Sequence, residues 1–236
     1  MINVLFYKYI AIENPEILIE KQKSLCSSLG LKGKILVSDE GVNGNIMGEK
    51  SVCEKYMTKL REDHRFSDVQ FKITKSDGKD FRRLIVKYRG EIIRLRAGDV
   101  DLKKKAPYIE PAELKKKLDD GEEIVFIDAR NNYEYKVGRF KGAINPKINI
   151  FSEWPKAVEK FEKLKDKTIV TYCTGGVRCE KASAYLKEKG FNNVYQLHGG
   201  ILNYGNSVGS EYWEGKCFVF DKRKPIDISE KTNSDI

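Results

Sequence analysis

The feature that most constrains the fold is a strand that leads directly into a cysteine loop and then into a helix. Residues 168–172 have the pattern of a buried strand, and the loop from Cys173 to Arg178 follows without a break. From about Arg178 the apolar residues repeat with a helical period as far as Gly190. Strand, short loop and helix in this order are typical of a parallel α/β sheet.

The rest of the second half repeats this alternation of helix and strand. Its further helices and strands are expected at residues 111–121, 124–127, 156–164 and 194–197. In open parallel sheets, binding sites form beyond the carboxyl ends of the strands. Asp128, Cys173 and His198 each follow one of the three strands. We therefore expect these three residues at one edge of the sheet.

The first half alternates strand and helix in the order β-α-β-β-α-β, which predicts a ferredoxin-like α+β domain. The second helix is expected to begin at a capping box formed by Ser51 and Glu54. A hairpin of residues 84–88 and 91–95 is expected to extend the sheet as an added ribbon. The other expected elements are strands at 3–12, 34–38, 42–47 and 69–74, and helices at 15–30 and 51–62.

These patterns divide the chain into two domains. The first domain is expected at residues 1–97, and the second at residues 111–213. Residues 98–110, which include a run of three lysines, have no clear periodicity and are expected to be a linker. Residues 214–236 form a C-terminal segment whose polar end is expected to be disordered.

The cysteine loop has the composition of an anion-binding nest at a helix N-terminus. Two glycines allow the backbone to curl, and such a nest lowers the pKa of a cysteine. Cys173 is therefore the candidate nucleophile, and Arg178 can add positive charge or bind an adjacent carboxylate. The backbone of the loop is formed by Thr174, Gly175, Gly176 and Val177.

Loop length separates two kinds of cysteine chemistry. Cysteine phosphatases cradle phosphate in a loop with five residues between cysteine and arginine, whereas only four separate Cys173 from Arg178. The tighter ring suits sulfur carried on the thiolate, as a persulfide, better than phosphate. A phosphatase is thus the weakest interpretation. The non-functional interpretation is a buried cysteine beside a glycine turn.

The remaining cysteines give no sign of a disulfide framework or a metal site. The chain has 5 cysteines and 2 histidines, widely scattered and without CxxC spacing, so neither disulfides nor structural zinc are expected. Cys179 follows Arg178 directly and either resolves an oxidised Cys173 as a disulfide or packs inward. We interpret Cys26, Cys53 and Cys217 as structural.

Composition favours a protein without membrane spans. No apolar segment approaches the length of a membrane helix, and the first residues do not resemble a signal peptide, so a cytoplasmic location is expected. The net charge of +9 favours an anionic partner such as nucleic acid, and equally suits a solvated lysine-rich surface.

Several motifs of the second half resemble the rhodanese domain. Asp128-Ala129-Arg130 resembles its Asp-x-Arg motif after a central strand, which gives Asp128 and Arg130 supporting roles at the site. Glu134 and residues 138–145 resemble a second rhodanese motif, with Arg139 where histidine is usual. Residues 194–201 resemble the closing strand and Gly-Gly turn.

Three further segments extend the resemblance to nearly the whole chain. Residues 38–44, 173–183 and 213–221 are similar to the TrhO family of bacterial rhodanese-domain proteins. Many of that family continue into a cysteine-containing tail, whereas this sequence ends at Ile236. The resemblance implies an acylphosphatase-like first domain, and a persulfide-type cysteine at the position of Cys173.

The same resemblance implies a reaction and its partners. It implies oxygen-dependent hydroxylation of the wobble uridine in the tRNA anticodon loop. Molecular oxygen and an unidentified reductant would be needed, with no flavin, haem or metal motif evident, and DNA is not an expected partner. The candidate RNA-binding residues, which a solvated surface would also explain, are Arg82, Arg83, Arg89, Arg94 and Arg96.

Two alternatives remain at the level of sequence. A sulfurtransferase would use the same loop, because the loop indicates persulfide chemistry and does not identify the acceptor. A non-catalytic docking module in an RNA-associated complex is less consistent with the presence of both Cys173 and Arg178. The sequence indicates neither the electron source nor the oligomeric state.

Overall fold

The computed structural model describes residues 1–98, 100–220 and 223–229. These residues form two compact units. The first contains residues 1–93, together with Phe220 and Arg223, and the second contains residues 94–219 and the described residues from 224 onward.

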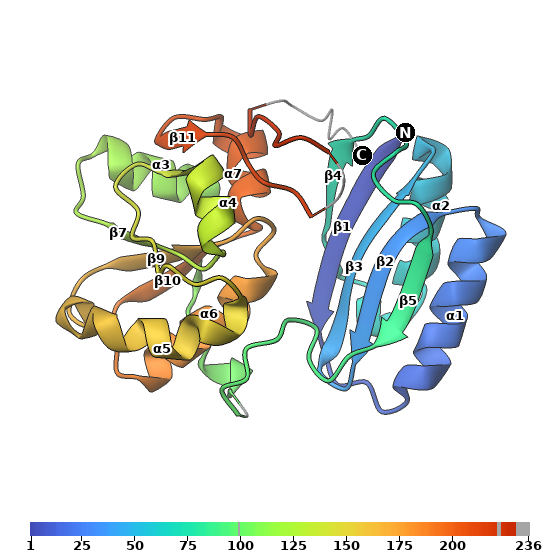
Figure 1. Cartoon of the computed structure of the whole chain (residues 1–236), viewed down its shortest axis with the longest axis horizontal. Helices are drawn as coiled ribbons and strands as arrows, with labels where there is room; N and C mark the ends of the chain where they lie inside the picture. Colours follow the sequence, from blue (N-terminus) through green and yellow to red (C-terminus); the bar gives the residue numbers. More distant parts are fainter. Residues whose placement is uncertain (99, 221–222, 230–236) are drawn as a thin grey trace. The chain divides into compact units, whose positions relative to one another are not determined.

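The first unit is a five-stranded sheet with two helices on one face (Figure 1). The strand order is β4-β1-β3-β2-β5. The pairs β4–β1, β1–β3 and β3–β2 are antiparallel, and β5 lies parallel to β2. The elements are β1 (Ile2–Tyr9), α1 (Pro15–Ser28), β2 (Lys32–Ser38), β3 (Gly41–Gly48), α2 (Lys50–Arg61), the 3-10 turn η1 (His64–Phe66), β4 (Phe71–Lys75) and β5 (Leu84–Tyr88). The ferredoxin-like prediction is confirmed.

Alternation along the strands builds the core of this unit. Val4 and Phe6 of β1 and Ile35 of β2 point toward the helices, where they are buried with Tyr56. Gly44 lies opposite Phe6, and a side chain on Gly44 would collide with the Phe6 ring. Burying each large apolar side chain contributes about 1.5–3 kcal/mol, so packing on this face of the sheet stabilises the fold of the first unit.

Two local predictions for this unit are wrong. Residues 91–95 form no strand, because Ile92 instead contacts the side chains of Glu40 and Asn43 through its backbone. The capping box at Ser51 is also absent, because the helix begins one residue earlier, at Lys50, with Glu49 as its N-cap. The conformation of residues 91–95 therefore follows from the burial of Ile92 and not from strand pairing.

The second unit is a parallel sheet of four strands in the order β6-β10-β9-β7. This confirms the predicted rhodanese-like α/β architecture. A small antiparallel pair, β8 with β11, lies apart from the main sheet. The strands are β6 (Tyr108–Ile109), β7 (Val125–Asp128), β8 (Gly138–Phe140), β9 (Ile169–Tyr172), β10 (Val194–Leu197) and β11 (Trp213–Gly215).

Helices and 3-10 turns connect these strands. The segment expected as one helix at 156–164 is a short α-helix followed by a 3-10 turn. The helices are α3 (Pro111–Asp119), α4 (Asn132–Val137), α5 (Trp154–Val158), α6 (Val177–Glu188) and α7 (Gly200–Val208). The 3-10 turns are η2 (Leu102–Lys104), η3 (Phe151–Glu153) and η4 (Glu159–Leu164).

The segments expected as linker and tail contain regular structure. Residues 98–110 include η2 and the edge strand β6, which is too short to show a periodicity. In the C-terminal segment, Cys217 pairs with Ile226 in an isolated antiparallel bridge. The end expected to be disordered, residues 230–236, lies outside the described residues.

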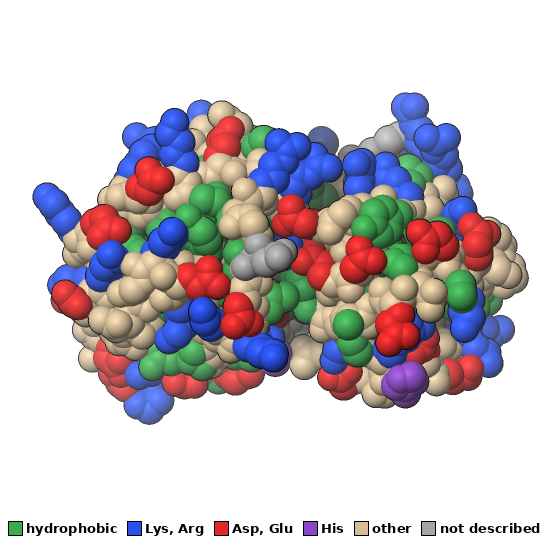
Figure 2. All heavy atoms as spheres, turned by 90° about the horizontal axis from the view of Figure 1, so that it is seen from below, with side chains coloured by type: hydrophobic (Ala, Val, Ile, Leu, Met, Phe, Trp, Pro, Cys, Tyr) green, Lys and Arg blue, Asp and Glu red, His purple; other side chains and the backbone are tan. Residues whose placement is uncertain are grey.

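Surface charge is mixed on the face shown in Figure 2, where basic and acidic side chains are interspersed. The positive net charge of +9 is therefore not gathered into one patch on that face. No helix among the described residues is long and apolar enough to cross a membrane.

Candidate active site

Cys173 stands at the carboxyl end of β9, where the chain turns into α6. Gly176 takes the left-handed conformation, with φ 99°, at the N-cap of α6, which a residue with a side chain would adopt only with strain. This turn directs the Gly176 N–H at Cys173 Sγ, 3.2 Å away, and the backbone N–H of Arg178 also donates to the sulfur. The nest expected from the sequence therefore surrounds the cysteine sulfur itself.

The surroundings of Cys173 stabilise its thiolate. Burial opposes ionisation, but a hydrogen bond from the Cys179 thiol, the charge of Arg178 and the two backbone N–H groups outweigh it. Together they lower the pKa of Cys173 to about 5. At neutral pH the residue is thus a nucleophilic thiolate.

Cys179 is the protonated partner of this pair. It is fully buried in the first turn of α6, and burial followed by the hydrogen bond to Cys173 raises its pKa well above the ordinary value. The two N–H donors lie at Cys173 and not at Cys179, so the negative charge belongs on Cys173. The arrangement uses Cys179 as a hydrogen-bond donor in the reduced protein.

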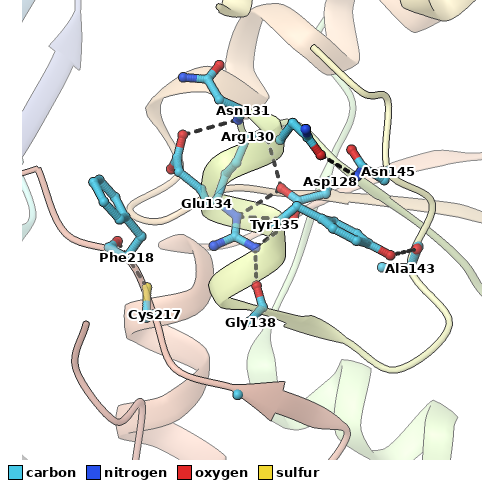
Figure 3. Close-up of polar contacts among 12 residues, drawn as sticks. Asp128, Arg130, Asn131, Glu134, Tyr135, Gly138, Ala143, Asn145, Cys217 and Phe218 are labelled. Carbon is cyan, nitrogen blue, oxygen red and sulfur yellow. Dashed lines mark hydrogen bonds and ion pairs between the residues drawn. The ribbon is translucent and has the colours of Figure 1, made fainter. Parts of the chain in front are cut away.

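Arg178 binds a carboxylate that the sequence did not assign to it. Its Nη1 and Nη2 lie 2.7 and 2.8 Å from the two carboxylate oxygens of Glu134, a buried residue of α4. Glu134 also accepts a hydrogen bond of 3.1 Å from the backbone N–H of Asn131 (Figure 3). The Asn131-x-x-Glu134 spacing at a helix start is the sequence signal that could have indicated this role.

Asp128 and Arg130 form a second buried ion pair beside the site. Both are 0% exposed, and their closest N–O distance is 2.6 Å. Arg130 also donates to the carbonyl oxygen of Gly138 at 2.6 Å (Figure 3), and its guanidinium lies over the rings of Tyr172 and Trp213. Neither is a hydrogen-bond partner of the Cys173 sulfur. Their positions make them supports of the sheet edge.

The Gly199–Gly200 turn after β10 closes against the cysteine loop. The N–H groups of Ile201 and Leu202 donate to the carbonyl oxygens of Cys173 and Thr174 at 2.9 and 3.1 Å. A Cβ on Gly200 would lie 2.4 Å from the Cys173 oxygen, so the close approach requires glycine. This contact positions the loop from outside its own segment.

His198, the residue before this turn, contacts the edge strand rather than the cysteine. Its Nδ1 lies 2.5 Å from an oxygen of Glu110, and its ring packs on Tyr108 with centroids 4.7 Å apart. Tyr108 in turn donates to Glu180, which is also paired with Lys105. These contacts of His198 were not predicted from the sequence, because strand β6 was not predicted.

The other cysteines are protonated and buried, as expected of structural residues. All five cysteines are free. Burial raises the pKa of Cys26 and of Cys217 to about 12 and that of Cys53 to about 11. Cys217 lies near the two ion pairs, since the charges of Arg130 and Glu134 act on it. Among the described residues no group of His, Cys, Asp and Glu could hold a metal ion.

The five candidate RNA-binding arginines are exposed and are divided between the two units. Arg82 and Arg83 precede β5 and Arg89 follows it, all in the first unit. Arg94 and Arg96 belong to the second unit.

Comparisons with known proteins agree with the two units. Residues 1–92 match the UPF0176 acylphosphatase-like domain, and residues 110–207 match the rhodanese-like domain. A protein of Bacillus licheniformis named tRNA uridine(34) hydroxylase is 45% identical over 233 residues, covering 97% of this chain and 72% of the relative. The chain belongs to the tRNA uridine(34) hydroxylase family.

A second curated relative supports membership of the tRNA uridine(34) hydroxylase family. A protein of that name from Enterococcus faecalis is 48% identical over 96% of this chain and 73% of its own length. Among solved structures, a rhodanese-like domain from Anabaena sp. is 26% identical, with a TM-score of 0.39, covering 46% of this chain and 79% of that domain.

Proposed function

We infer that this chain hydroxylates carbon 5 of the uridine at position 34 of tRNA, with Cys173 as its nucleophile. The observation that carries the inference is a thiolate at the start of α6, in a chain of the tRNA uridine(34) hydroxylase family. Because Cys173 is buried, the uracil must leave the base stack of the anticodon loop to reach it. A tRNA substrate supports a cytoplasmic location.

Covalent addition accounts for the need for a thiolate. Attack of Cys173 on carbon 6 forms a C–S bond and moves the π electrons of the C5–C6 bond onto carbon 5 and oxygen 4. Arg178 and the N-terminus of α6 provide a positive field beside this negative charge. Carbon 5 is thereby made nucleophilic toward oxygen.

Molecular oxygen and an external two-electron reductant complete the reaction. Uridine, one O₂, two electrons and two protons give 5-hydroxyuridine and one water. Loss of the proton from carbon 5 then expels the Cys173 thiolate and restores the double bond. The low pKa of Cys173 favours this last step, because a stable thiolate is a good leaving group.

Nucleoside mass spectrometry of tRNA tests the inference. Cells that lack the protein are complemented with the wild type, with Cys173→Ser, or with Cys53→Ser as a matched control at a buried, protonated cysteine. We expect 5-hydroxyuridine with the wild type and the control, and none with Cys173→Ser. Full modification by Cys173→Ser would exclude Cys173 as the nucleophile.

A sulfurtransferase is the second candidate, because the four-residue loop around Cys173 suits a persulfide. It predicts a persulfide on Cys173 after exposure to thiosulfate, and transfer of that sulfur to cyanide. If cells without a redundant enzyme keep their 5-hydroxyuridine when the protein is absent, and thiosulfate turnover depends on Cys173, the sulfurtransferase is the better assignment.

A further inference from the structure

The sheet of the first unit has a second face, opposite its helices, that carries cationic side chains from several strands. Helices α1 and α2 cover one face of the sheet (Figure 1), and the core side chains of β1 and β2 are buried on that face. Because successive side chains of a strand point to opposite faces, the residues between them lie on the other side. We call this surface the lysine face; it includes Lys32, Lys34, Lys72, Lys87 and the adjoining Arg89.

The acidic side chain of Asp80 binds a strand on this face, where it accepts a hydrogen bond from Asn3 and is already paired with Arg223. The five strands contain no Asp or Glu. In the turn between β2 and β3, Asp39 accepts a hydrogen bond from Tyr88, and Glu40 accepts one from the backbone of Ile92. Among the ion pairs of the described residues, none includes Lys34, Lys87 or Arg89.

The helical side of the same unit is built differently. There, lysines lie next to acidic residues one turn away, as in the pairs of Lys23 with Glu20 and Lys59 with Glu62. Such pairs are typical of a solvated helix surface. Lys34, Lys87 and Arg89 have no such acidic residue paired with them among the described ion pairs, so a solvated surface of mixed charge does not describe this part of the lysine face.

Three of its cations are close enough to repel one another. Lys34 of β2 pairs with Ile85, and Leu36 with Lys87, so the two lysines lie on adjacent strands. Arg89 continues the same edge, with its N–H on the carbonyl oxygen of Val37 at 2.8 Å. The pKa of Lys34 is lowered by partial burial and then by the charges of Lys87 and Arg89. A bound anion would relieve this repulsion.

Aromatic side chains accompany the charge. Tyr7 and Tyr9 of β1 lie on the same face, with ring centroids 6.2 Å apart, and Lys72 lies 4.7 Å from the Tyr7 ring centre. Cations beside aromatic rings on a four- or five-stranded sheet suit single-stranded RNA, which offers both phosphates and unstacked bases. An acidic protein, the alternative anionic partner, would pair with the lysines but has no unstacked bases to contact the tyrosines.

We propose that the lysine face binds the phosphate backbone of the tRNA substrate, with Lys34, Lys87 and Arg89 as phosphate contacts. The identity of the RNA rests on the proposed function. The presence of a polyanion site rests on the arrangement of charge alone. Only Arg89 was among the arginines that the sequence suggested for this role.

Binding of an anticodon stem-loop RNA, followed by fluorescence anisotropy over a range of salt concentrations, tests the proposal. The variant is Lys34→Gln/Lys87→Gln/Arg89→Gln in the full chain. The control, Lys21→Gln/Lys23→Gln/Lys55→Gln, removes the same charge from exposed helix positions. We expect the Kd of the variant to rise roughly tenfold or more and its log–log salt slope to fall by about 2, since each phosphate contact contributes about 0.7. The control should match the wild type.

Equal weakening in variant and control, or no weakening in either, would overturn the proposal. Thermal unfolding and the Cys173 thiolate titration should be unchanged in the variant, and Lys87→Gln/Arg89→Gln replaces it if the triple variant does not fold. If RNA binds through this face but the wild type forms no 5-hydroxyuridine, the proposed function is wrong and the RNA-binding role of the lysine face is kept. If the wild type hydroxylates tRNA but the triple variant binds RNA as tightly as the wild type, the proposed function is kept and the RNA-binding role of the lysine face is wrong.

Discussion

Glu134 and Arg178 form a bidentate ion pair between α4 and the first turn of α6, with N–O distances of 2.7 and 2.8 Å. The two residues are 44 positions apart in the chain and are 0% and 5% exposed. The pair fixes the guanidinium whose charge helps to hold Cys173 as a thiolate. It therefore connects the stability of the domain to the chemistry of the loop.

Replacing Glu134 should destabilise the protein because it leaves a buried guanidinium without its carboxylate. We expect Glu134→Gln to lower the free energy of unfolding by about 3 kcal/mol, measured by urea denaturation. In a double-mutant cycle with Arg178→Met, the two changes together should cost less than the sum of the single changes. Additive single effects would show that the pair is not coupled.

The ionisation of Cys173 gives a prediction with a defined sign. Its pKa is lowered to about 5, so the thiolate is present at neutral pH and is lost as the pH falls through that value. The thiolate contribution to ultraviolet absorbance, taken as wild type minus Cys173→Ser, should fall with a midpoint near 5. A midpoint in the ordinary range of a cysteine would contradict the geometry described for the loop.

Cys179 should shift this titration, because its thiol donates to the Cys173 sulfur. Removing one hydrogen bond to a charged group costs about 1.5–3 kcal/mol, which is roughly one to two pKa units. Cys179→Ala should therefore move the midpoint upward, and Cys179→Ser, which keeps a donor, should move it less. Equal shifts in the two variants would mean that Cys179 acts only through packing.

Gly200 should be essential for the position of the loop. Gly200→Ala would place a Cβ 2.4 Å from the Cys173 carbonyl oxygen, and we expect loss of most hydroxylation and a raised Cys173 pKa. Gly121 is the matched control, because it also has a positive φ, 76°, but an added Cβ there would meet nothing within 4 Å. Alanine at a positive φ costs about 1–2 kcal/mol of backbone strain in each variant, so the difference between them reports the collision. Similar activity in both would refute the role of the close contact.

Asp128 should act on stability. Asp128→Asn leaves the fully buried Arg130 charge uncompensated, and we expect a loss of about 3 kcal/mol by urea denaturation. Asp120→Asn, at an exposed ion pair with Lys116, should be nearly neutral. If Asp128→Asn instead keeps its stability and abolishes hydroxylation, Asp128 takes part directly in the reaction.

Local pattern was enough to predict much of the fold. The β-α-β-β-α-β order of the first unit and the strand, loop and helix around Cys173 follow from periodicity, glycine and proline positions, which act over a few residues. The prediction was wrong at residues 91–95, where burial of Ile92 and its backbone contacts with Glu40 and Asn43 replace strand pairing. Strand β6 was missed because two residues carry no period.

Cys173 could be predicted as the candidate nucleophile from the sequence, together with its loop, because Cys173, Gly176 and Arg178 are neighbours in one short segment. The groups that surround that loop were known only from the tertiary structure. Glu134 and Gly200 reach it from other elements, and their choice depends on the packing of α4 and of the turn after β10. Contacts between residues far apart in the chain are selected by the whole fold, and no local pattern encodes them.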